Sequence, residues 1–220
     1  MSTASRSMKS LALGSLFFVA MAGASIAPAA PTTAASAPVK KATVGAAAPE
    51  FTLVDSKGTT HSLSSFKGKT VVLEWFNKGC PFVKKHYESS NNMQALQKRY
   101  TDKGVVWLTV VSSAEGKQGF ETPADTEKTR AEWKIASTAT LLDTKGDVGR
   151  MYDAKTTPHM YVIDPKGVLV YNGAIDSKSS SDAADIPKAQ NYVAGALDMV
   201  TSGKPVATAS TKPYGCSVKY

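Results

Sequence analysis

The feature that most constrains the fold is the segment over residues 70–81. Residues 70–76 are almost all apolar, which is typical of a strand that is buried on both faces of a sheet. A short turn with Gly79 follows, and Pro81 then suits the first turn of a helix, because its missing N–H is not needed there. A buried strand that leads directly into a helix predicts an α/β domain with a central sheet, and it places Cys80 at the junction.

Apolar periodicity predicts the remaining elements. We expect strands over residues 51–54, 105–111, 138–142, 160–163 and 168–171, and helices over residues 82–100, 124–135, 147–152 and 187–200. The last two strands flank Asp164-Pro165-Lys166-Gly167, which favours a type I turn, and so predict a hairpin. Strands alternate with helices before this hairpin, and that order predicts a three-layer α/β fold with a central mixed sheet.

The first 29 residues are typical of a secretory signal peptide. Arg6 and Lys9 precede an apolar run over residues 11–24, which is too short to span a membrane comfortably, and small residues follow. An uncleaved anchor is the alternative. Cleavage would leave no stable membrane anchor and an Ala/Pro/Thr-rich linker over residues 30–42. Export predicts an oxidising compartment, the periplasm if the source is a Gram-negative bacterium, where a disulfide can persist.

The net charge of +8 first suggests nucleic acid or an anionic membrane as a partner. The signal peptide accounts for two of these charges. The other basic residues are scattered, with one adjacent pair near Cys80 at residues 84–85, and aromatic residues are not interleaved with them. We therefore expect no nucleic acid partner. His61, His86 and His159 match no metal motif and no phosphate loop occurs, so we expect no metal and no cofactor.

Cys80 is a candidate nucleophile. The N–H groups and the dipole of the predicted helix stabilise a thiolate, which is the reactive form of cysteine. Lys78, Lys84 and Lys85 lie close in the sequence and add positive charge. The pattern predicts a reactive Cys80, and the alternative is an inert, buried cysteine at the end of a strand.

Four segments resemble the thioredoxin superfamily in its redoxin, or thiol-specific-antioxidant, branch. They are the strand, turn and helix over residues 71–83, the N-terminal segments over residues 44–53 and 62–69, and Thr156-Thr157-Pro158-His159, which resembles the cis-proline segment. The resemblance covers roughly residues 44–175. It implies a thioredoxin-like fold for a domain that we place at residues 43–202, with a C-terminal tail over residues 203–220.

The resemblance implies roles for individual residues. Cys80 matches the first, attacking cysteine of the C-x-x-C motif. Glu74, six residues earlier, matches the buried acid that moves protons during exchange; an exposed charge or an acid paired with a lysine is the alternative. Pro158 matches the cis-proline, which together with Thr157 and Pro81 is expected to dock the substrate.

The sequence also departs from the pattern of the superfamily. Val83 occupies the place of the second cysteine of C-x-x-C, so the usual local resolving step cannot occur. Peroxiredoxins carry their peroxidatic cysteine at that second position, after a proline and a threonine at set distances, and this signature is also missing. The remaining likeness is to a peroxiredoxin-like subgroup with a single active-site cysteine at the first position.

Cys216 is the only other cysteine and lies near the C-terminus. Three interpretations stay open. Cys216 could resolve an adduct on Cys80 from a mobile tail. It could instead form a static disulfide with Cys80, for which chain entropy suggests roughly 5 kcal/mol of stabilisation. It could also have no direct partnership with Cys80.

We predict an exported thiol–disulfide oxidoreductase in which Cys80 is the nucleophile, Glu74 transfers protons and Cys216 resolves. Its partners would be a disulfide-bearing protein or a peroxide, together with a reducing, thioredoxin-like protein. One alternative is a peroxiredoxin-like antioxidant peroxidase that uses the same two cysteines. The other is a non-catalytic binding or structural module in which a disulfide only staples the tail.

Overall fold

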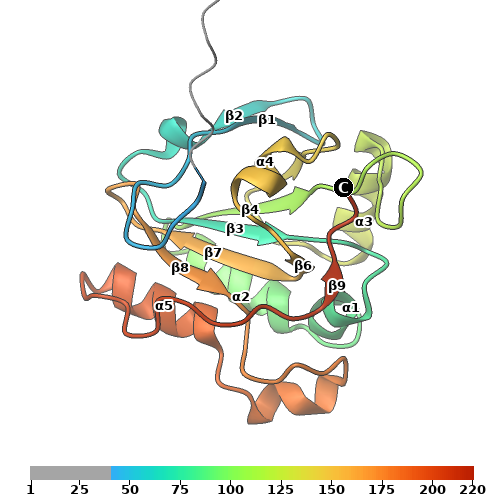
Figure 1. The fold of residues 1–220 in the computed structure, drawn as a ribbon. Coiled ribbons are helices and arrows are strands. Elements are labelled where there is room, and N and C mark those ends of the chain that lie inside the picture. Colours follow the sequence, from blue (N-terminus) through green and yellow to red (C-terminus); the bar gives the residue numbers. More distant parts are fainter. Residues whose placement is uncertain (1–40) are drawn as a thin grey trace, which may run out of the picture. The chain divides into compact units, whose positions relative to one another are not determined.

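The computed structural model of the protein describes residues 41–220 (Figure 1). The predicted signal peptide over residues 1–29 and nearly all of the predicted linker over residues 30–42 therefore lie outside the described residues. Within residues 41–220, no helix has the length and apolar character that crossing a membrane requires. The limits of the domain at residues 43 and 202 stay predictions.

A seven-stranded mixed sheet forms the middle layer, in the order β2-β1-β5-β4-β3-β7-β8. Its strands are β1 Thr52–Asp55, β2 Thr60–Ser62, β3 Val71–Trp75, β4 Val106–Val111, β5 Ala139–Leu142, β7 His159–Ile163 and β8 Leu169–Gly173. Strands β3, β4 and β5 are parallel, whereas β7 is antiparallel to both β3 and β8. The predicted mixed sheet and the predicted hairpin of β7 and β8 are confirmed.

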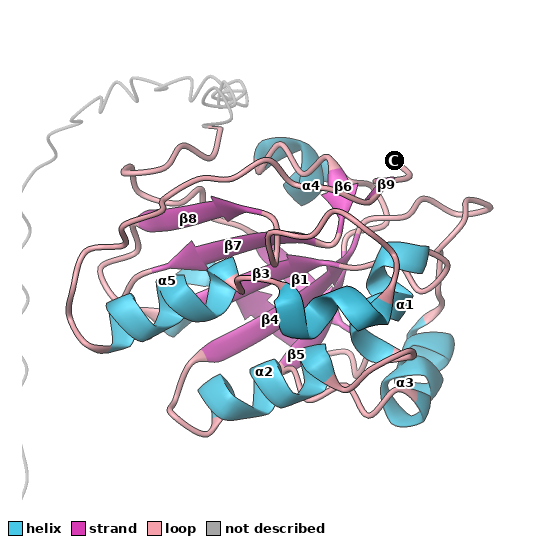
Figure 2. Cartoon of the chain, turned by 90° about the horizontal axis from the view of Figure 1, so that it is seen from below, coloured by secondary structure: helices cyan, strands magenta, loops and turns pink. Residues whose placement is uncertain are grey.

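Helices cover both faces of this sheet, which confirms the predicted three-layer α/β fold (Figures 1 and 2). Helices α1, α2 and α5 lie on one face, and α4 lies on the other. The helices are α1 Pro81–Tyr87, α2 Asn92–Thr101, α3 Pro123–Glu132, α4 Asp147–Met151 and α5 Tyr192–Thr201, with short 3-10 helices η1 Leu63–Phe66 and η2 Ala183–Lys188.

Strand β3 is the centre of the core. All five of its residues are buried, as the apolar run predicts. Side chains alternate between the two faces of a strand, so Val72 joins the apolar cluster beneath α1, α2 and α5, whereas Val71 and Trp75 join the cluster beneath α4. Glu74 faces the same layer as Val72. This places an acidic group inside the protein, on the side of the sheet that carries α1.

Three of the predicted helices have wrong limits. The helix expected over residues 82–100 is split into α1 and α2, because the Ser90 hydroxyl donates to the Lys85 carbonyl oxygen at 2.7 Å and competes with further helical bonds. The helix expected from residue 187 begins at Tyr192, where the Asn191 side chain accepts from the Ala194 N–H at 2.8 Å. Helix α3 ends at Glu132, three residues earlier than expected.

The C-terminal tail over residues 203–220 contains a short strand near its end. It runs beside β8, where the Thr211 N–H donates to the Asn172 carbonyl oxygen at 3.1 Å, and then reaches the end of α1 that carries Cys80 (Figure 1). There, β9 Cys216–Ser217 pairs antiparallel with β6 Thr156–Thr157. Two segments far apart in the sequence thus form a small second sheet beside the junction of β3 and α1.

Candidate active site

Cys80 lies at the junction between β3 and α1, and its side chain is fully buried. It is the N-cap residue of α1, with Pro81 at the first helical position, so the predicted junction is confirmed. The thiol donates a hydrogen bond to the carbonyl oxygen of Thr157 at 3.0 Å. Because Cys80 has no exposed surface, a substrate reaches its sulfur only when a neighbouring segment moves.

The three lysines near Cys80 in the sequence each have an acidic partner. The pairs are Lys78 with Glu132 at 3.2 Å, Lys84 with Glu88 at 3.3 Å and Lys85 with Asp176 at 3.8 Å. Because each lysine is paired with an acid, the three lysines stabilise a Cys80 thiolate less than the sequence argument assumes. The reactivity of Cys80 stays a prediction, and it depends mainly on the position of Cys80 at the start of α1.

The proline expected to be cis is cis. The Thr157–Pro158 peptide bond has this conformation, and it directly follows β6. The Thr157 carbonyl oxygen is the acceptor for the Cys80 thiol, so the segment lies beside the sulfur, as the resemblance implies. The structure therefore brings together Cys80, Pro81, Thr157 and Pro158, although their role in docking a substrate stays a prediction.

Cys216 lies next to Cys80. In the pairing of β6 with β9, Cys216 is the register partner of Thr157, and it packs against the apolar cluster that contains Cys80. Both thiols are free. Burial raises the pKa of the Cys216 thiol to about 11, and its hydrogen bond to the neighbouring Cys80 adds to this rise. The tail thus supplies a second thiol at a site whose local motif lacks one.

Glu74 is fully buried and accepts three hydrogen bonds from neutral donors. These donors are the Tyr87 hydroxyl at 2.7 Å, the Trp107 indole N–H at 2.8 Å and the Gln97 amide at 3.0 Å. Burial raises the pKa of Glu74 to about 7, and the hydrogen bonds oppose this rise in part. An exposed charge or a pairing with lysine is therefore wrong for Glu74. Its carboxyl group can gain or lose a proton near neutral pH, whereas its role in catalysis stays a prediction.

His86 and His159 are buried, and each has its own hydrogen-bond partner. His86 Nδ1 bonds to the Asn92 side-chain amide at 2.8 Å, and His159 Nε2 bonds to Oδ1 of the Asn172 side chain at 2.7 Å. Burial lowers the pKa of both imidazoles to about 4, so both are neutral at pH 7. Over residues 41–220, no three His, Cys, Asp or Glu side chains gather closely enough to bind a metal ion.

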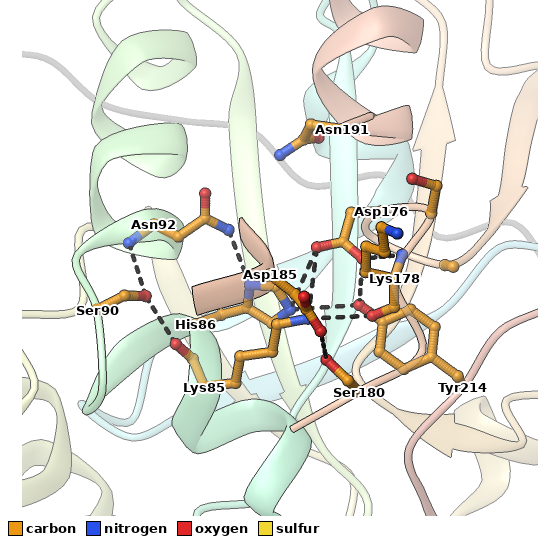
Figure 3. Close-up of polar contacts among 12 residues, drawn as sticks. Lys85, His86, Ser90, Asn92, Asp176, Lys178, Ser180, Asp185, Asn191 and Tyr214 are labelled. Atoms are coloured by element: carbon orange, nitrogen blue, oxygen red, sulfur yellow. Dashed lines mark hydrogen bonds and ion pairs between the residues drawn. The ribbon is translucent and has the colours of Figure 1, made fainter. Parts of the chain in front are cut away.

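The sequence did not predict a cluster of four polar residues that lies beside the site (Figure 3). We call it the tail anchor, and it consists of Lys85, His86, Asp176 and Tyr214. Lys85 and His86 lie on α1, Asp176 follows β8, and Tyr214 lies in the tail two residues before Cys216. The sequence offers the basic pair at residues 84–85 as a signal, but nothing in it indicates which acid lies opposite.

A buried cysteine that begins a helix, a cis-proline beside its sulfur and a mixed sheet covered on both faces define a thioredoxin-like protein. The comparison with protein families agrees. The AhpC/TSA family matches residues 44–172, which is more than half of the chain, and the chain belongs to this family. The predicted thioredoxin-like superfamily and its redoxin branch are thus confirmed, whereas the single-cysteine subgroup stays a prediction.

Two curated relatives and two solved structures extend this likeness. The thioredoxin-like protein YneN of Bacillus subtilis is 28% identical over 145 residues, which cover 64% of this chain and 79% of YneN. The thiol-disulfide oxidoreductase ResA of Geobacillus kaustophilus is 28% identical over 124 residues, which cover 56% of this chain and 65% of ResA, slightly less than two thirds.

Both solved structures are of proteins without a described function. An uncharacterized conserved protein of Geobacillus kaustophilus has a TM-score of 0.71 and 27% identity, and the match covers 81% of this chain and 92% of the other. A hypothetical protein of Sinorhizobium meliloti has a TM-score of 0.68 and 24% identity, and the match covers 82% and 96%. The second likeness is one of fold alone.

Proposed function

We propose that this protein is a thiol–disulfide oxidoreductase in which Cys80 is the nucleophile and Cys216 is the resolving cysteine. The observation that carries the proposal is the pairing of Cys216 with Thr157, beside the Cys80 thiol. Position 83, where the C-x-x-C motif has its second cysteine, is a valine here, and Cys216 of the tail would supply the missing thiol. Membership of the AhpC/TSA family and the relative named a thiol-disulfide oxidoreductase support redox chemistry at this site.

The reaction has two exchange steps. The Cys80 thiolate attacks one sulfur of the substrate disulfide, so the substrate bond breaks, a bond between Cys80 and the substrate forms, and the other substrate sulfur leaves and takes a proton. The Cys216 thiolate then attacks the Cys80 sulfur and releases the second substrate thiol. Two electrons have passed to the substrate, and the protein holds a Cys80–Cys216 disulfide that a dithiol protein must reduce.

Glu74 has the property that a proton acceptor for this exchange needs. Its pKa of about 7 lets it gain or lose a proton near neutral pH. It faces the same layer as Phe76, which packs in the cluster that contains Cys80. The raised pKa of Cys216 lowers its thiolate fraction, so a proton acceptor would assist its attack, because only the thiolate attacks.

We further propose that the protein acts after export on disulfide-bearing proteins, and that a thioredoxin-like protein reduces it again. The N-terminal sequence supports export, because its charge, apolar run and small residues follow the pattern of a signal peptide. Pro81, Thr157 and Pro158 would dock the substrate, since the Thr157 carbonyl oxygen contacts the Cys80 thiol and the two prolines directly follow Cys80 and Thr157 in the chain.

Trapping of the two disulfides tests the proposal. The reduced protein is incubated with glutathione disulfide, remaining thiols are blocked with iodoacetamide, and the bonds are mapped by mass spectrometry. We expect a Cys80–Cys216 disulfide in the wild type and a stable Cys80–glutathione adduct in Cys216→Ser. Cys80→Ser should form neither product. A wild type that never forms the Cys80–Cys216 bond would refute the two-cysteine mechanism.

Hydrogen peroxide in place of glutathione disulfide tests the peroxidase alternative. A peroxidatic Cys80 thiolate would break the O–O bond to give a sulfenic acid and water, and Cys216 would then displace a second water. Rapid peroxide turnover that vanishes in Cys80→Ser, together with slow reaction with disulfides, would favour the peroxidase. Failure of Cys80 to react with either oxidant would favour a non-catalytic module.

A further inference from the structure

The tail is bound to the body of the protein on both sides of Cys216. Before Cys216, the Ala174 N–H donates to the Thr211 hydroxyl at 2.9 Å, and the Tyr214 hydroxyl donates to Asp176 at 2.6 Å. After Cys216, the Val218 N–H donates to the Lys155 carbonyl oxygen at 3.1 Å, and the Tyr220 hydroxyl donates to the Ala154 carbonyl oxygen at 2.8 Å. Cys216 therefore lies within a segment that is attached at both of its ends.

The centre of this segment fits tightly against the residue that precedes the cis-proline. Gly215 has a φ of +126°, and a Cβ there would lie 2.1 Å from the Thr157 carbonyl oxygen. Only glycine tolerates this approach. The same Thr157 oxygen accepts the hydrogen bond of the Cys80 thiol. Strand β9 thus covers both the edge of β6 and the sulfur.

Tyr214 attaches this cover to the tail anchor (Figure 3). One oxygen of Asp176 accepts the Tyr214 hydroxyl at 2.6 Å, and its other oxygen lies 3.8 Å from Lys85 Nζ and 3.9 Å from His86 Nε2. The Tyr214 ring also packs against Phe82, with ring centroids 5.9 Å apart. Lys85, His86 and Phe82 all lie on α1, so the tail is attached to the helix that begins at Cys80.

The tail anchor does not depend on the tail for most of its bonds. Lys85 is fully buried and donates to the Lys178 carbonyl oxygen at 3.0 Å, while the Lys178 N–H donates to Asp176 at 2.9 Å. His86 keeps its bond to Asn92. Only Tyr214 comes from the tail. The receiving surface can therefore persist when the tail leaves, which makes the attachment reversible.

We propose that Tyr214 and Asp176 are positioning residues, whose hydrogen bond sets the fraction of molecules in which the tail covers Cys80 and places Cys216 beside it. A protein substrate reaches Cys80 only after β9 leaves the edge of β6, and resolution requires β9 to return. The link to resolution rests on the proposed role of Cys216. The covering of Cys80 stands on the geometry alone.

Alkylation of Cys80 measures the uncovered fraction in the reduced, full-length protein. Iodoacetamide is added without any oxidant, and the Cys80 peptide is quantified over time by mass spectrometry. We expect Tyr214→Phe to accelerate Cys80 alkylation about tenfold, because a hydrogen bond to a charged acceptor is lost. The matched control is Tyr100→Phe, which removes a hydroxyl that donates to Asp198 at 2.8 Å away from the tail, and it should change the rate less than about twofold.

A second variant tests whether the tail covers Cys80 while leaving the tail anchor unchanged. Gly215→Ala should accelerate Cys80 alkylation at least as much as Tyr214→Phe does, because its Cβ collides with the Thr157 carbonyl oxygen. Gly58→Ala is the control, since Gly58 also has a positive φ, of +83°, but a Cβ there meets no atom within 4 Å. Equal acceleration in variant and control would indicate general loosening and overturn the proposal.

Resolution should change in the opposite direction. In Tyr214→Phe carrying a Cys80–glutathione adduct, formation of the Cys80–Cys216 bond should be slower than in the wild type, because a smaller fraction of molecules holds Cys216 beside Cys80. Unchanged Cys80 alkylation in Tyr214→Phe would overturn the positioning role even if the wild type forms the Cys80–Cys216 disulfide. A wild type without that disulfide would instead refute the proposed function, because the alkylation assay uses no oxidant.

Discussion

Two buried carboxyl groups lie near α1, and different neighbours stabilise them. The Glu74 carboxyl group accepts hydrogen bonds from three neutral donors, and no cation among residues 41–220 forms an ion pair with it. The Asp176 carboxylate instead faces Lys85 and His86 and accepts the Tyr214 hydroxyl. Burial without a compensating charge raises the pKa of Glu74 to about 7, since the neutral acid is easier to bury.

This difference suits the two groups to different tasks: the group around Glu74 can bind and release a proton, whereas the group around Asp176 can hold the tail in position. Glu74 changes its charge near neutral pH while its neighbours stay in place, because all of them belong to the body of the fold. Asp176 lies 3.8 Å from the Lys85 ammonium group, and the one member of the tail anchor that comes from the tail is Tyr214. A buried ion pair also carries a risk, since removal of one partner leaves the other charge without compensation.

The largest effect should come from removal of the Asp176 charge. Asp176→Ala leaves the fully buried Lys85 ammonium group without its carboxylate, and we expect the free energy of unfolding to fall by about 3–5 kcal/mol. Urea denaturation measures this change. The double variant Lys85→Met with Asp176→Leu removes both charges and should recover much of the loss. A single variant as stable as the wild type would mean that the pair is not buried.

Glu74→Gln should change how stability depends on pH. The pKa of Glu74 in the folded protein is raised to about 7 from 4.5, so the folded state binds more protons than the unfolded state between these values. The free energy of unfolding of the wild type should therefore fall, relative to Glu74→Gln, as pH rises from 4.5 to 7, by an amount on the order of 3 kcal/mol. Urea denaturation over this range measures it.

The two buried histidines also make stability depend on pH, but they do not affect this comparison. The lowered pKa of both His86 and His159 means that stability falls as pH drops from 6.5 to about 4, which is the opposite direction. Both proteins contain these histidines, so their contribution cancels in the difference between wild type and variant. Parallel pH curves for the two proteins would contradict the raised pKa of Glu74.

Tyr87→Phe and Tyr214→Phe compare the two groups by the same chemical change. The Tyr87 hydroxyl donates to Glu74 at 2.7 Å, and Tyr87→Phe should lower the free energy of unfolding by about 1–3 kcal/mol. The decrease should be larger at pH 8 than at pH 5, because the hydrogen bond is stronger to the ionised carboxyl group. The loss in Tyr214→Phe should lack this dependence on the ionisation of Glu74, because Tyr214 donates to Asp176 instead. Urea unfolding curves at both pH values measure these losses. Equal pH dependence in the two variants would contradict the difference drawn between the Glu74 group and the Asp176 group.

The smallest effect should come from an exposed ion pair, which serves as a baseline. Lys98 on α2 and Asp102, the C-cap residue of that helix, are 2.9 Å apart, with side chains that are 71% and 59% exposed. Solvent screens such a pair, so Lys98→Ala should lower the free energy of unfolding by less than about 0.5 kcal/mol, and added salt should shrink the difference. A loss comparable to that of Asp176→Ala would contradict the role assigned to burial.

Sequence reasoning was most successful where the signal is local. The apolar run of residues 71–75 predicts a central strand, and Pro81 predicts the start of the helix that Cys80 caps, because both signals depend on neighbours in the chain. The break between α1 and α2 was missed although its cause is also local. Ser90 bonds to the backbone of Lys85, but a serine in this position does so only when the chain already turns there.

The sequence by itself determined the α/β class, the place of Cys80 and the proline before β7, since each follows from apolar periodicity or from a short motif. Only the tertiary structure decided that Glu74 is buried, that Cys216 pairs with Thr157 and that Asp176 lies opposite Lys85. These contacts join residues some 60 to 90 positions apart, and no periodicity links such residues. The packing of the sheet and of the tail across its edge brings them together.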